Sequence, residues 1–188
     1  GGMSETANRL LDIIHDNTQR LDRMVLDVLK LNRRDRAHTE HFPLGEFLHT
    51  FAQQFCSIER IDPRIVRVEL ELEPIVSFDR SHLNQVMWNL CRNALRHCRA
   101  LPSSITVRVD PGARIDRVRL SVIDDGPGVA AQHRPHLFEP FFTTVATGTG
   151  LGLYIAREVC EANGASLEYV ESSAGGHFCL DCRRVQPG

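Results

Sequence analysis

The spacing of hydrophobic residues predicts a long amphipathic helix at the start of this chain. Between residues 5 and 34, apolar side chains recur at helical spacing along one narrow seam. The seam consists of Leu10, Ile14, Leu21, Met24, Val28 and Leu31, and Asn17 completes it at the same spacing. A narrow seam cannot be buried on a lone helix, so we expect it to pair, most simply with a second copy of the chain. Packing onto the chain's own globular part is the alternative.

Further helices and strands are predicted after a polar linker over residues 32 to 39. Helical periodicity is expected over 44–58, from a cap at Asp79 or Ser81 to about 97, and over 151–162, where Asn163-Gly164 ends the helix. Alternation with a period of two predicts strands over 66–72, 105–109 and 117–123, a short strand is expected over 75–78, and strands over 166–170 and 176–182 should close the sheet. Helices combined with mostly antiparallel strands predict a two-layer α/β sandwich.

Composition narrows the class of protein. A length of 188 residues allows one domain, or one domain with an appendage. The net charge of −2 argues against a nucleic-acid-binding surface. No apolar run approaches the roughly 18 residues that a membrane span requires, and no signal peptide is visible. Gly1-Gly2-Met3 is interpreted as an expression scar, so we expect the chain to be a fragment of a longer protein.

Six cysteines are present, and without an export signal they are expected to be reduced thiols. Cys179 and Cys182 form a C-x-x-C pair in a predicted strand, where positions three apart face opposite sides. A zinc site needs about four ligands in compatible geometry. We therefore expect no metal or redox role for this pair.

Two glycine clusters, separated by a phenylalanine-rich segment, carry the main chemical signal. The first is Asp124-Asp125-Gly126-Pro127-Gly128, and the second is Gly148-Thr149-Gly150-Leu151-Gly152-Leu153. A carboxylate accepts hydrogen bonds from an exocyclic amine, and glycines let the backbone approach a base or phosphates closely. The second cluster opens a predicted helix, whose N-terminus favours anions. Together they predict a nucleotide site, whereas each alone is also compatible with a surface turn.

The predicted helix that ends near residue 97 places polar side chains along one face. Asn89 and Asn93 are four residues apart and share that face, and Arg96 and His97 follow one turn later. An amide oxygen from Asn93, together with phosphate oxygens and waters, suits octahedral Mg²⁺. Arg96 and His97 are candidates to contact phosphate. Two solvent-facing asparagines on an exposed helix are the alternative.

In order along the chain, the segments NQVMWNLCRNAL, DDGPG, LFEPFF and GTGLGL resemble the N box, first glycine box, F box and second glycine box of one family. That family is the ATP-binding catalytic domain of sensor histidine kinases, within the ATPase superfamily that also includes gyrase, Hsp90 and MutL. The resemblance covers residues 40–185. It implies a Bergerat ATP-binding fold, with a mixed sheet and helices on one face, and it implies ATP and Mg²⁺ as cofactors.

The resemblance also implies roles for individual residues. Asn93 is expected to hold the metal, Asn89 to support it, and Asp124 to read the adenine amino group. Residues 130–147 resemble a mobile ATP lid anchored by Phe138, Phe141 and Phe142, although Val145 stands where many relatives carry a basic residue. The expected nucleotide-binding set is Asn89, Asn93, Arg96, His97, Asp124, Gly126, Gly128, Val129, Phe138, Phe142, Thr143, Thr144, Gly148, Thr149, Gly150, Leu151, Gly152 and Leu153.

Residues 4–38 resemble the second helix of a dimerisation hairpin whose first helix carries the phosphoryl-accepting histidine. No acceptor box is present, because His15-Asp16 is not followed by the family's proline. We therefore expect this chain to bind ATP without completing autophosphorylation, and we expect no catalytic acceptor residue within it.

The segments NLCRNALRH and FFTTVATGTGLGLYIAREVCEANGASLEY most resemble sensor kinases of the PilS type, which control type IV pilus expression. This resemblance implies a bacterial inner-membrane protein with the present part in the cytoplasm, and a response-regulator receiver domain as partner. Two alternatives remain, a nucleotide-sensing dimer without chemistry and an ATPase of the gyrase or Hsp90 kind. The absence of any acid from Asn84 to Asn93 counts against the ATPase, which needs a group to activate water.

Overall fold

The computed structural model describes residues 7–11, 13–15, 17–18, 21, 25, 37–145 and 148–185. The described residues up to 25 are helical and exposed, and the Asn17 side-chain amide donates to the carbonyl of Ile13 at 2.9 Å. Of the predicted seam, Met24, Val28 and Leu31 lie outside the described residues, as do 1–3 and 32–36. The long N-terminal helix and its pairing therefore stay predictions.

In the globular part, helices and strands are interspersed along the chain. They are β1 (Glu40–Pro43), α2 (Leu44–Glu59), the 3₁₀ turn η2 (Pro63–Ile65), β2 (Val66–Leu70), β3 (Ile75–Phe78), α3 (Arg80–His97), β4 (Ile105–Pro111), β5 (Arg117–Asp124), the 3₁₀ turn η3 (Ala131–His136), α4 (Gly152–Ala162), β6 (Ser166–Tyr169) and β7 (His177–Val185). The helices and strands predicted after residue 40 are all present, with ends shifted by a few residues.

One mixed sheet joins the described strands in the order β1-β3-β7-β5-β4-β2, and β6 pairs with β7 beside this path. The pair β2 and β4 is parallel, whereas the other pairs are antiparallel. β5 lies between β4 and β7, so its last residue, Asp124, emerges from the middle of the sheet. This topology confirms the predicted mixed sheet.

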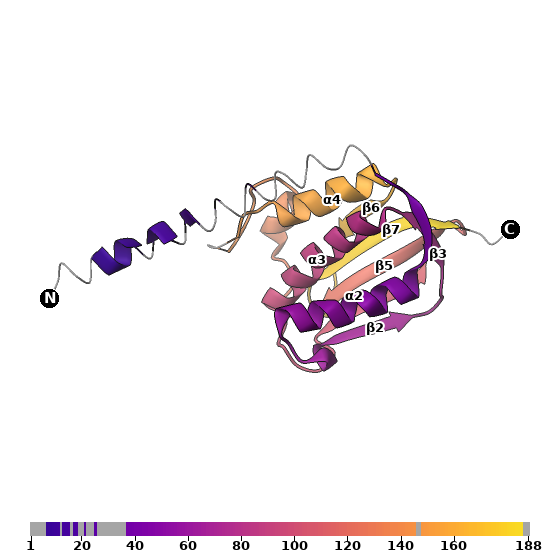
Figure 1. Ribbon diagram of the computed structural model, residues 1–188, viewed down its shortest axis with the longest axis horizontal. Helices are drawn as coiled ribbons and strands as arrows, with labels where there is room; N and C mark the ends of the chain where they lie inside the picture. The colour runs from indigo at the N-terminus through magenta and orange to yellow at the C-terminus, as the bar shows by residue number, and fades with distance from the viewer. Residues whose placement is uncertain are drawn as a thin grey trace.

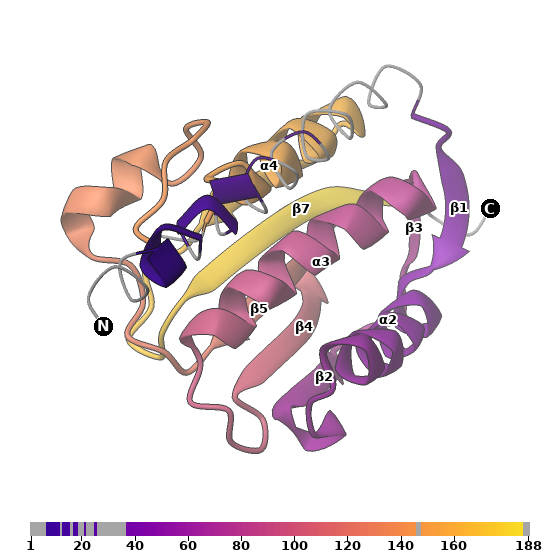
Figure 2. The ribbon, with the colours of Figure 1, turned by 60° about the vertical axis from the view of Figure 1, so that its left-hand side comes forward.

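Helices α2, α3 and α4 cover the same face of the sheet (Figures 1 and 2). Strand alternation explains why: Leu120 and Leu180 point into the helical layer and are buried, whereas the neighbouring Arg119 is exposed on the open face. Phe51 and Phe55 of α2 pack edge-on and tilted against Trp88 of α3, with ring centroids 5.8 and 5.1 Å away. The two-layer sandwich predicted from the sequence is thus confirmed.

β1 is the strand that the hydrophobic pattern did not predict. Only Phe42 among its four residues is buried, so there is no alternation for a period-of-two search to detect. The strand exists because its backbone pairs with β3, a contact set by tertiary structure. The turns η2 and η3 were missed for a similar reason, since each is short and carries a proline.

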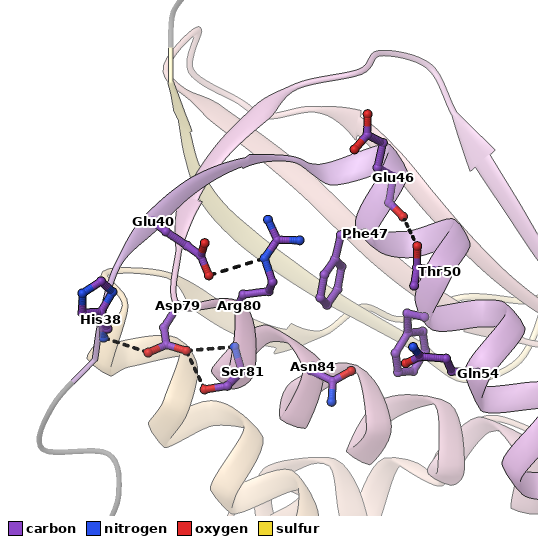
Figure 3. Close-up of a pocket in the computed structure, with 11 residues that line it drawn as sticks. His38, Glu40, Glu46, Phe47, Thr50, Gln54, Asp79, Arg80, Ser81 and Asn84 are labelled. Carbon is purple, nitrogen blue, oxygen red and sulfur yellow. Dashed lines mark hydrogen bonds and ion pairs between the residues drawn. The ribbon is translucent and has the colours of Figure 1, made fainter.

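The start of α3 is a junction for several parts of the fold. The carboxylate of Asp79 caps the helix by accepting from the backbone N–H groups of Ser81 and His82 at 2.9 and 3.0 Å. Its other oxygen accepts the backbone N–H of His38 at 2.7 Å. The Asn163 side chain, at the end of α4, accepts from the Asp79 backbone N–H at 2.9 Å and lies 3.0 Å from His82 Nδ1. The Asp79 carboxylate therefore links the incoming chain to α3 (Figure 3), and the Asp79 backbone links α3 to the end of α4.

None of the helices in the described ranges is both long enough and apolar enough to cross a bilayer.

Candidate nucleotide-binding site

A cavity of about 620 Å³ lies between the second half of α3, the end of β5, the loop that follows it and the start of α4. Most of the residues predicted for nucleotide binding line it. They are Asn89, Asn93, Arg96, His97, Asp124, Gly128, Val129, Phe142, Thr143, Thr144, Gly148, Thr149, Gly150, Gly152 and Leu153. Segments that are far apart in the sequence, from Asn89 to Phe178, thus meet at one cavity.

Three predicted residues do not line the cavity. Leu151 is a buried core residue, 2% exposed, at the cap position of α4. The Phe138 ring lies edge-on to Phe178, with centroids 6.3 Å apart, and the Arg157 guanidinium lies 5.5 Å from its centre. Gly126 lies behind Asp124 and donates its N–H to that carboxylate at 2.9 Å. In this structure these three residues support the site from outside the cavity, and their direct contact with a nucleotide stays a prediction.

Asp124 is the carboxylate at the floor of the cavity, and it is 5% exposed. One oxygen, Oδ1, accepts the backbone N–H groups of Gly126 and Gly176 at 2.9 and 3.2 Å. Burial raises the pKa of this carboxyl, whereas these two hydrogen bonds and the proximity of His97 act to lower it. The Oδ2 atom accepts no hydrogen bond from any described residue. Asp124 is therefore oriented through one oxygen, and its second oxygen stays available to a ligand.

Close backbone packing explains the first glycine cluster. A Cβ at Gly126 would lie 2.5 Å from the carbonyl oxygen of His97 and 2.7 Å from Asp124 Oδ1. Any side chain here would separate the end of α3 from the end of β5. Glycine at this position thus brings His97 and Asp124 to the same cavity.

Asn89 and Asn93 lie on the α3 face that lines the cavity, and both are half-buried. A Cβ at Gly152, the first residue of α4, would be 3.7 Å from the amide oxygen of Asn89. This contact brings the second glycine cluster against the asparagine face of α3. Arg96 and His97, in the last turn of α3, are exposed at the rim.

The N-terminus of α4 adds unsatisfied donors to the cavity. No side chain caps this helix, and its first turn contains no acidic residue. The first backbone N–H groups of a helix have no intrahelical partner, and the helix dipole makes this end attractive to anions. The start of α3, by contrast, is capped by Asp79, and the start of α2, which also lacks a side-chain cap, carries Glu46 in its first turn.

Aromatic and polar contacts hold the segment between the glycine clusters near its two ends. The Phe142 ring lies 5.8 and 5.6 Å from the rings of His133 and His136, which belong to η3. The backbone N–H of Val129 donates to the Tyr169 hydroxyl at 3.1 Å. Thr143 Oγ1 accepts the backbone N–H of Val145 at 3.1 Å, which closes a tight turn. Residues 146 and 147 of the predicted lid lie outside the described part.

Phe141 and Gly150 form a strained contact at the tip of this segment. Phe141 has a φ of 67°, which is unfavourable for a side chain of its size, and it is 63% exposed. Gly150 has a φ of 70°, and a Cβ there would overlap the carbonyl carbon of Phe141. Glycine at position 150 is thus required both by its own backbone angle and by this close approach.

Several lining residues were not predicted from the sequence. They are Arg92, Pro127, Ala130, His133, Leu137, Val145, Gly176 and Phe178. Phe178 belongs to the start of β7 and Gly176 directly precedes this strand, and both reach the cavity because β7 pairs with β5. The adjacent glycines 175 and 176 could have indicated a close approach of the backbone to the site, because a side chain at Gly176 would meet the Asp124 carboxylate.

Across the described residues, no group of three His, Cys, Asp or Glu side chains is arranged to hold a metal ion. Any divalent cation at this cavity would therefore need ligands from a bound molecule in addition to the amide oxygen of Asn93, which is a suitable hard donor.

Comparison with known proteins identifies one protein family for this chain. The family model described as histidine kinase-, DNA gyrase B-, and HSP90-like ATPase matches residues 78–184. The sensor protein kinase PilS of Pseudomonas aeruginosa is 39% identical over 173 residues, which cover 89% of this chain and 32% of PilS. The chain therefore spans less than two thirds of the length of that relative.

Solved structures show the same fold. The catalytic domain of histidine kinase ThkA is 26% identical with a TM-score of 0.63, and the match covers 78% of this chain and 96% of that domain. Full-length ShkA in complex with AMPPNP has a TM-score of 0.72 at 24% identity, covering 89% of this chain and 36% of ShkA. The latter supports the fold alone.

Proposed function

Because this chain belongs to the family of histidine kinase-, DNA gyrase B- and HSP90-like ATPases, we propose that its cavity binds Mg-ATP and that the chain is the catalytic part of a sensor histidine kinase. The observation that carries the proposal is the convergence of Asp124, the asparagine face of α3 and the uncapped start of α4 on one cavity. The cavity of about 620 Å³ falls in the range of small-molecule and cofactor sites.

Asp124 would recognise the adenine ring. Its Oδ1 is occupied by two backbone donors, so Oδ2 would accept a hydrogen bond from the exocyclic amino group. Guanine presents a carbonyl at the corresponding position, and two acceptors facing each other in a buried site are unfavourable. The site would therefore prefer adenine nucleotides.

The phosphates would lie toward α4 and the end of α3. The open N–H groups of α4 and the exposed guanidinium of Arg96 would offset the negative charge of the phosphates. Asn93 would supply an amide oxygen to Mg²⁺, with the remaining ligands coming from phosphate and water. The metal ion would supply charge neutralisation on the transferring phosphoryl group.

Phosphoryl transfer to a separate acceptor fits this cavity better than hydrolysis. Of the described residues that line it, Asp124 alone is a carboxylate, and it is already engaged by two backbone donors. α3 contains no acidic residue over its whole length, so it offers no base to activate water. The domain would position ATP and stabilise charge, while a histidine outside this chain accepts the phosphoryl group.

The same proposal extends to the whole protein. The N-terminal segment 4–38 would be the second helix of a dimerisation hairpin, and residues 40–185 the ATP-binding domain. The phosphoryl group would pass from the histidine to an aspartate on the receiver domain of a response regulator. The full-length protein would lie at a bacterial inner membrane, with this domain in the cytoplasm.

Calorimetric titration tests the nucleotide site. We expect Mg-ATP to bind the parent protein, and we expect Asp124→Asn to lose at least about tenfold in affinity, equivalent to roughly 1.4 kcal/mol. GTP should bind the parent more weakly than ATP. Asp116→Asn is the matched control, because it removes the same charge on the β4–β5 connection, away from the cavity. Equal ATP affinity in the two variants would contradict the proposed role of Asp124.

A further inference from the structure

A group of side chains outside the nucleotide cavity contacts the start of the segment between the two glycine clusters. Tyr169 at the end of β6, Arg134 in η3 and the nearby Glu171 line a separate depression, and none of the three lines the nucleotide cavity. Val129, which directly follows the first glycine cluster, does line that cavity. Any effect of the three side chains on a bound nucleotide would therefore pass through wall residues such as Val129.

Side chains satisfy both backbone polar groups of Val129. Its N–H donates to the Tyr169 hydroxyl at 3.1 Å, and its carbonyl accepts the Nε–H of Arg134 at 2.9 Å. Val129 belongs to no helix or strand, so secondary structure does not provide these bonds. Backbone groups that are shielded from water without a partner are costly, and Val129 is half-buried against the core. The position of this wall residue thus depends on two side chains.

The two side chains also support each other. The Arg134 guanidinium lies 5.9 Å from the centre of the Tyr169 ring, and its Nη1 is 2.7 Å from a carboxylate oxygen of Glu171. The Tyr169 ring in turn lies edge-on to Phe178 of β7, with centroids 5.4 Å apart. The fixed fork of a guanidinium lets one arginine bond two acceptors at once. We call Tyr169 and Arg134, with the Val129 backbone that they bind, the Val129 clamp.

Glycine packing places the clamp at the end of the cavity where Asp124 lies. A Cβ at Gly128 would lie 3.4 Å from the Tyr169 hydroxyl and 3.3 Å from the carbonyl oxygen of Gly175. A Cβ at Gly175 would in turn overlap the carbonyl oxygen of Asp124. The hydroxyl therefore belongs to a layer of close-packed backbone that includes Asp124, the residue proposed to recognise adenine.

We propose that Tyr169 and Arg134 are positioning residues for nucleotide binding, which hold Val129 in the cavity wall near Asp124. This inference rests on the proposed nucleotide site and assigns a role to side chains outside it. A wall residue that is already held loses little conformational freedom when a ligand binds, so the clamp increases affinity. When the clamp is broken, the nucleotide itself must order the chain at Val129, which costs affinity.

Tyr169→Phe isolates the hydroxyl contact, because phenylalanine keeps a ring beside Phe178 and Arg134. We expect Mg-ATP to bind about fivefold more weakly by calorimetry, at a temperature where thermal unfolding shows both proteins to be folded. Tyr154→Phe is the matched control, because it removes the chain's other tyrosine hydroxyl from α4, outside the cavity, and should bind like the parent. Parent-like affinity in Tyr169→Phe would overturn the proposal.

Arg134→Lys tests the second contact without changing the net charge. A lysine ammonium lacks the planar fork, so it cannot bond the Val129 carbonyl and Glu171 in the same way. We expect Mg-ATP to bind about threefold to fivefold more weakly. Glu171→Gln should change the affinity by less than about twofold, because the Glu171 side chain is 75% exposed and exposed ion pairs contribute little. A larger loss in Glu171→Gln than in Arg134→Lys would contradict the clamp.

Amide hydrogen exchange of the nucleotide-free protein measures the clamp directly. The Val129 amide should exchange at least about threefold faster in Tyr169→Phe than in the parent, because it loses its acceptor. General destabilisation alone would instead act on Val122 in the middle of β5, whose exchange requires the sheet to open, and would leave Val129 unchanged. Unchanged exchange at Val129 would therefore count against the clamp whatever the affinities are.

The parent protein separates this inference from the proposed function. If the parent binds Mg-ATP and Tyr169→Phe binds it equally well, the clamp is wrong and the kinase proposal stands. If the parent is folded but binds no nucleotide, the proposed function fails, and the role of the clamp in binding fails with it. Weaker binding by Tyr169→Phe, with normal binding by the parent and Tyr154→Phe, supports both.

Discussion

At the scale of single residues, Asp124 meets two opposing demands. Recognition of an amino group requires an oxygen acceptor in a site shielded from water, yet burial raises the pKa of the carboxyl and disfavours its charge. The backbone N–H groups of Gly126 and Gly176 offset part of this effect. The residue that reads the ligand is therefore expected to reduce the stability of the empty domain.

Asp124→Asn should thus be at least as stable as the parent at pH 7, although it loses ATP affinity. A raised pKa means that the carboxyl stabilises the fold below its ordinary pKa, and that this stabilisation is lost as the pH rises through the raised value. Asparagine does not titrate, so the variant does not lose stability in this way as the pH rises. Its side-chain oxygen can still accept both backbone N–H groups. Thermal unfolding from pH 4 to pH 8 measures the difference. A drop of more than about 4 °C at pH 7 would contradict this account.

Asp79 shows the opposite pH dependence. Burial disfavours its charge, but the donors of Ser81, His82 and His38 together lower its pKa. The stabilisation from a lowered pKa is present above the ordinary value for aspartate and is lost as the pH falls through the lowered one.

In urea unfolding between pH 2.5 and pH 6, the parent should therefore lose stability more steeply with acid than Asp79→Asn does. Asparagine is also a good N-cap, so at the acidic end the two proteins should converge. Parallel curves across the whole range would show that the Asp79 charge is not coupled to folding.

At the scale of elements, the contact between Phe141 and Gly150 fixes the tip of the segment over the nucleotide cavity. Gly150→Ala adds a methyl group that overlaps the Phe141 backbone, so this segment must move. We expect Mg-ATP affinity to fall at least about tenfold by calorimetry.

Gly164→Ala is the matched control for backbone strain. Gly164 has a φ of 65°, close to the 70° of Gly150, but nothing lies within 4 Å of its added methyl group. Both variants should lose about 1–2 kcal/mol of stability from the left-handed backbone. Only Gly150→Ala should lose ATP affinity, and an equal loss in both variants would rule out the contact as the cause.

The elements also show which parts of the fold a sequence pattern can predict. α2, α3 and α4 were predictable because each buries one stripe of apolar side chains, which leaves a period in the sequence. β1 left no period because a single side chain is buried, and its position depends on backbone pairing with β3.

The same distinction holds within the site. Asn89, Asn93 and Asp124 were found because polar residues at fixed spacing stand out on a helix or at a strand end. Gly176 and Phe178 were not, because they reach the cavity through the pairing of β7 with β5. Phe138 was placed in the site by its motif, but it packs on Phe178 beneath the segment.

At the scale of the whole molecule, the ATP-binding domain should be separable from the N-terminal segment. The described sheet and its three covering helices form their core within residues 40–185. A shortened chain of residues 37–185 should unfold within about 3 °C of the parent and bind Mg-ATP equally. Light scattering after size exclusion should show a dimer for the parent and a monomer for the shortened chain. A dimer in both would place the pairing surface on the globular domain.

The position of β7 has a consequence for biosynthesis. β7 is the last strand in the described chain, yet it pairs with β3, β5 and β6 and so lies inside the sheet. A nascent chain emerging from the ribosome can form helices early, but the two halves of the sheet stay unjoined until residue 185 is released. Folding of this domain is therefore completed only after its synthesis, and a premature stop shortly before β7 would leave apolar strand edges for chaperones and proteases to recognise.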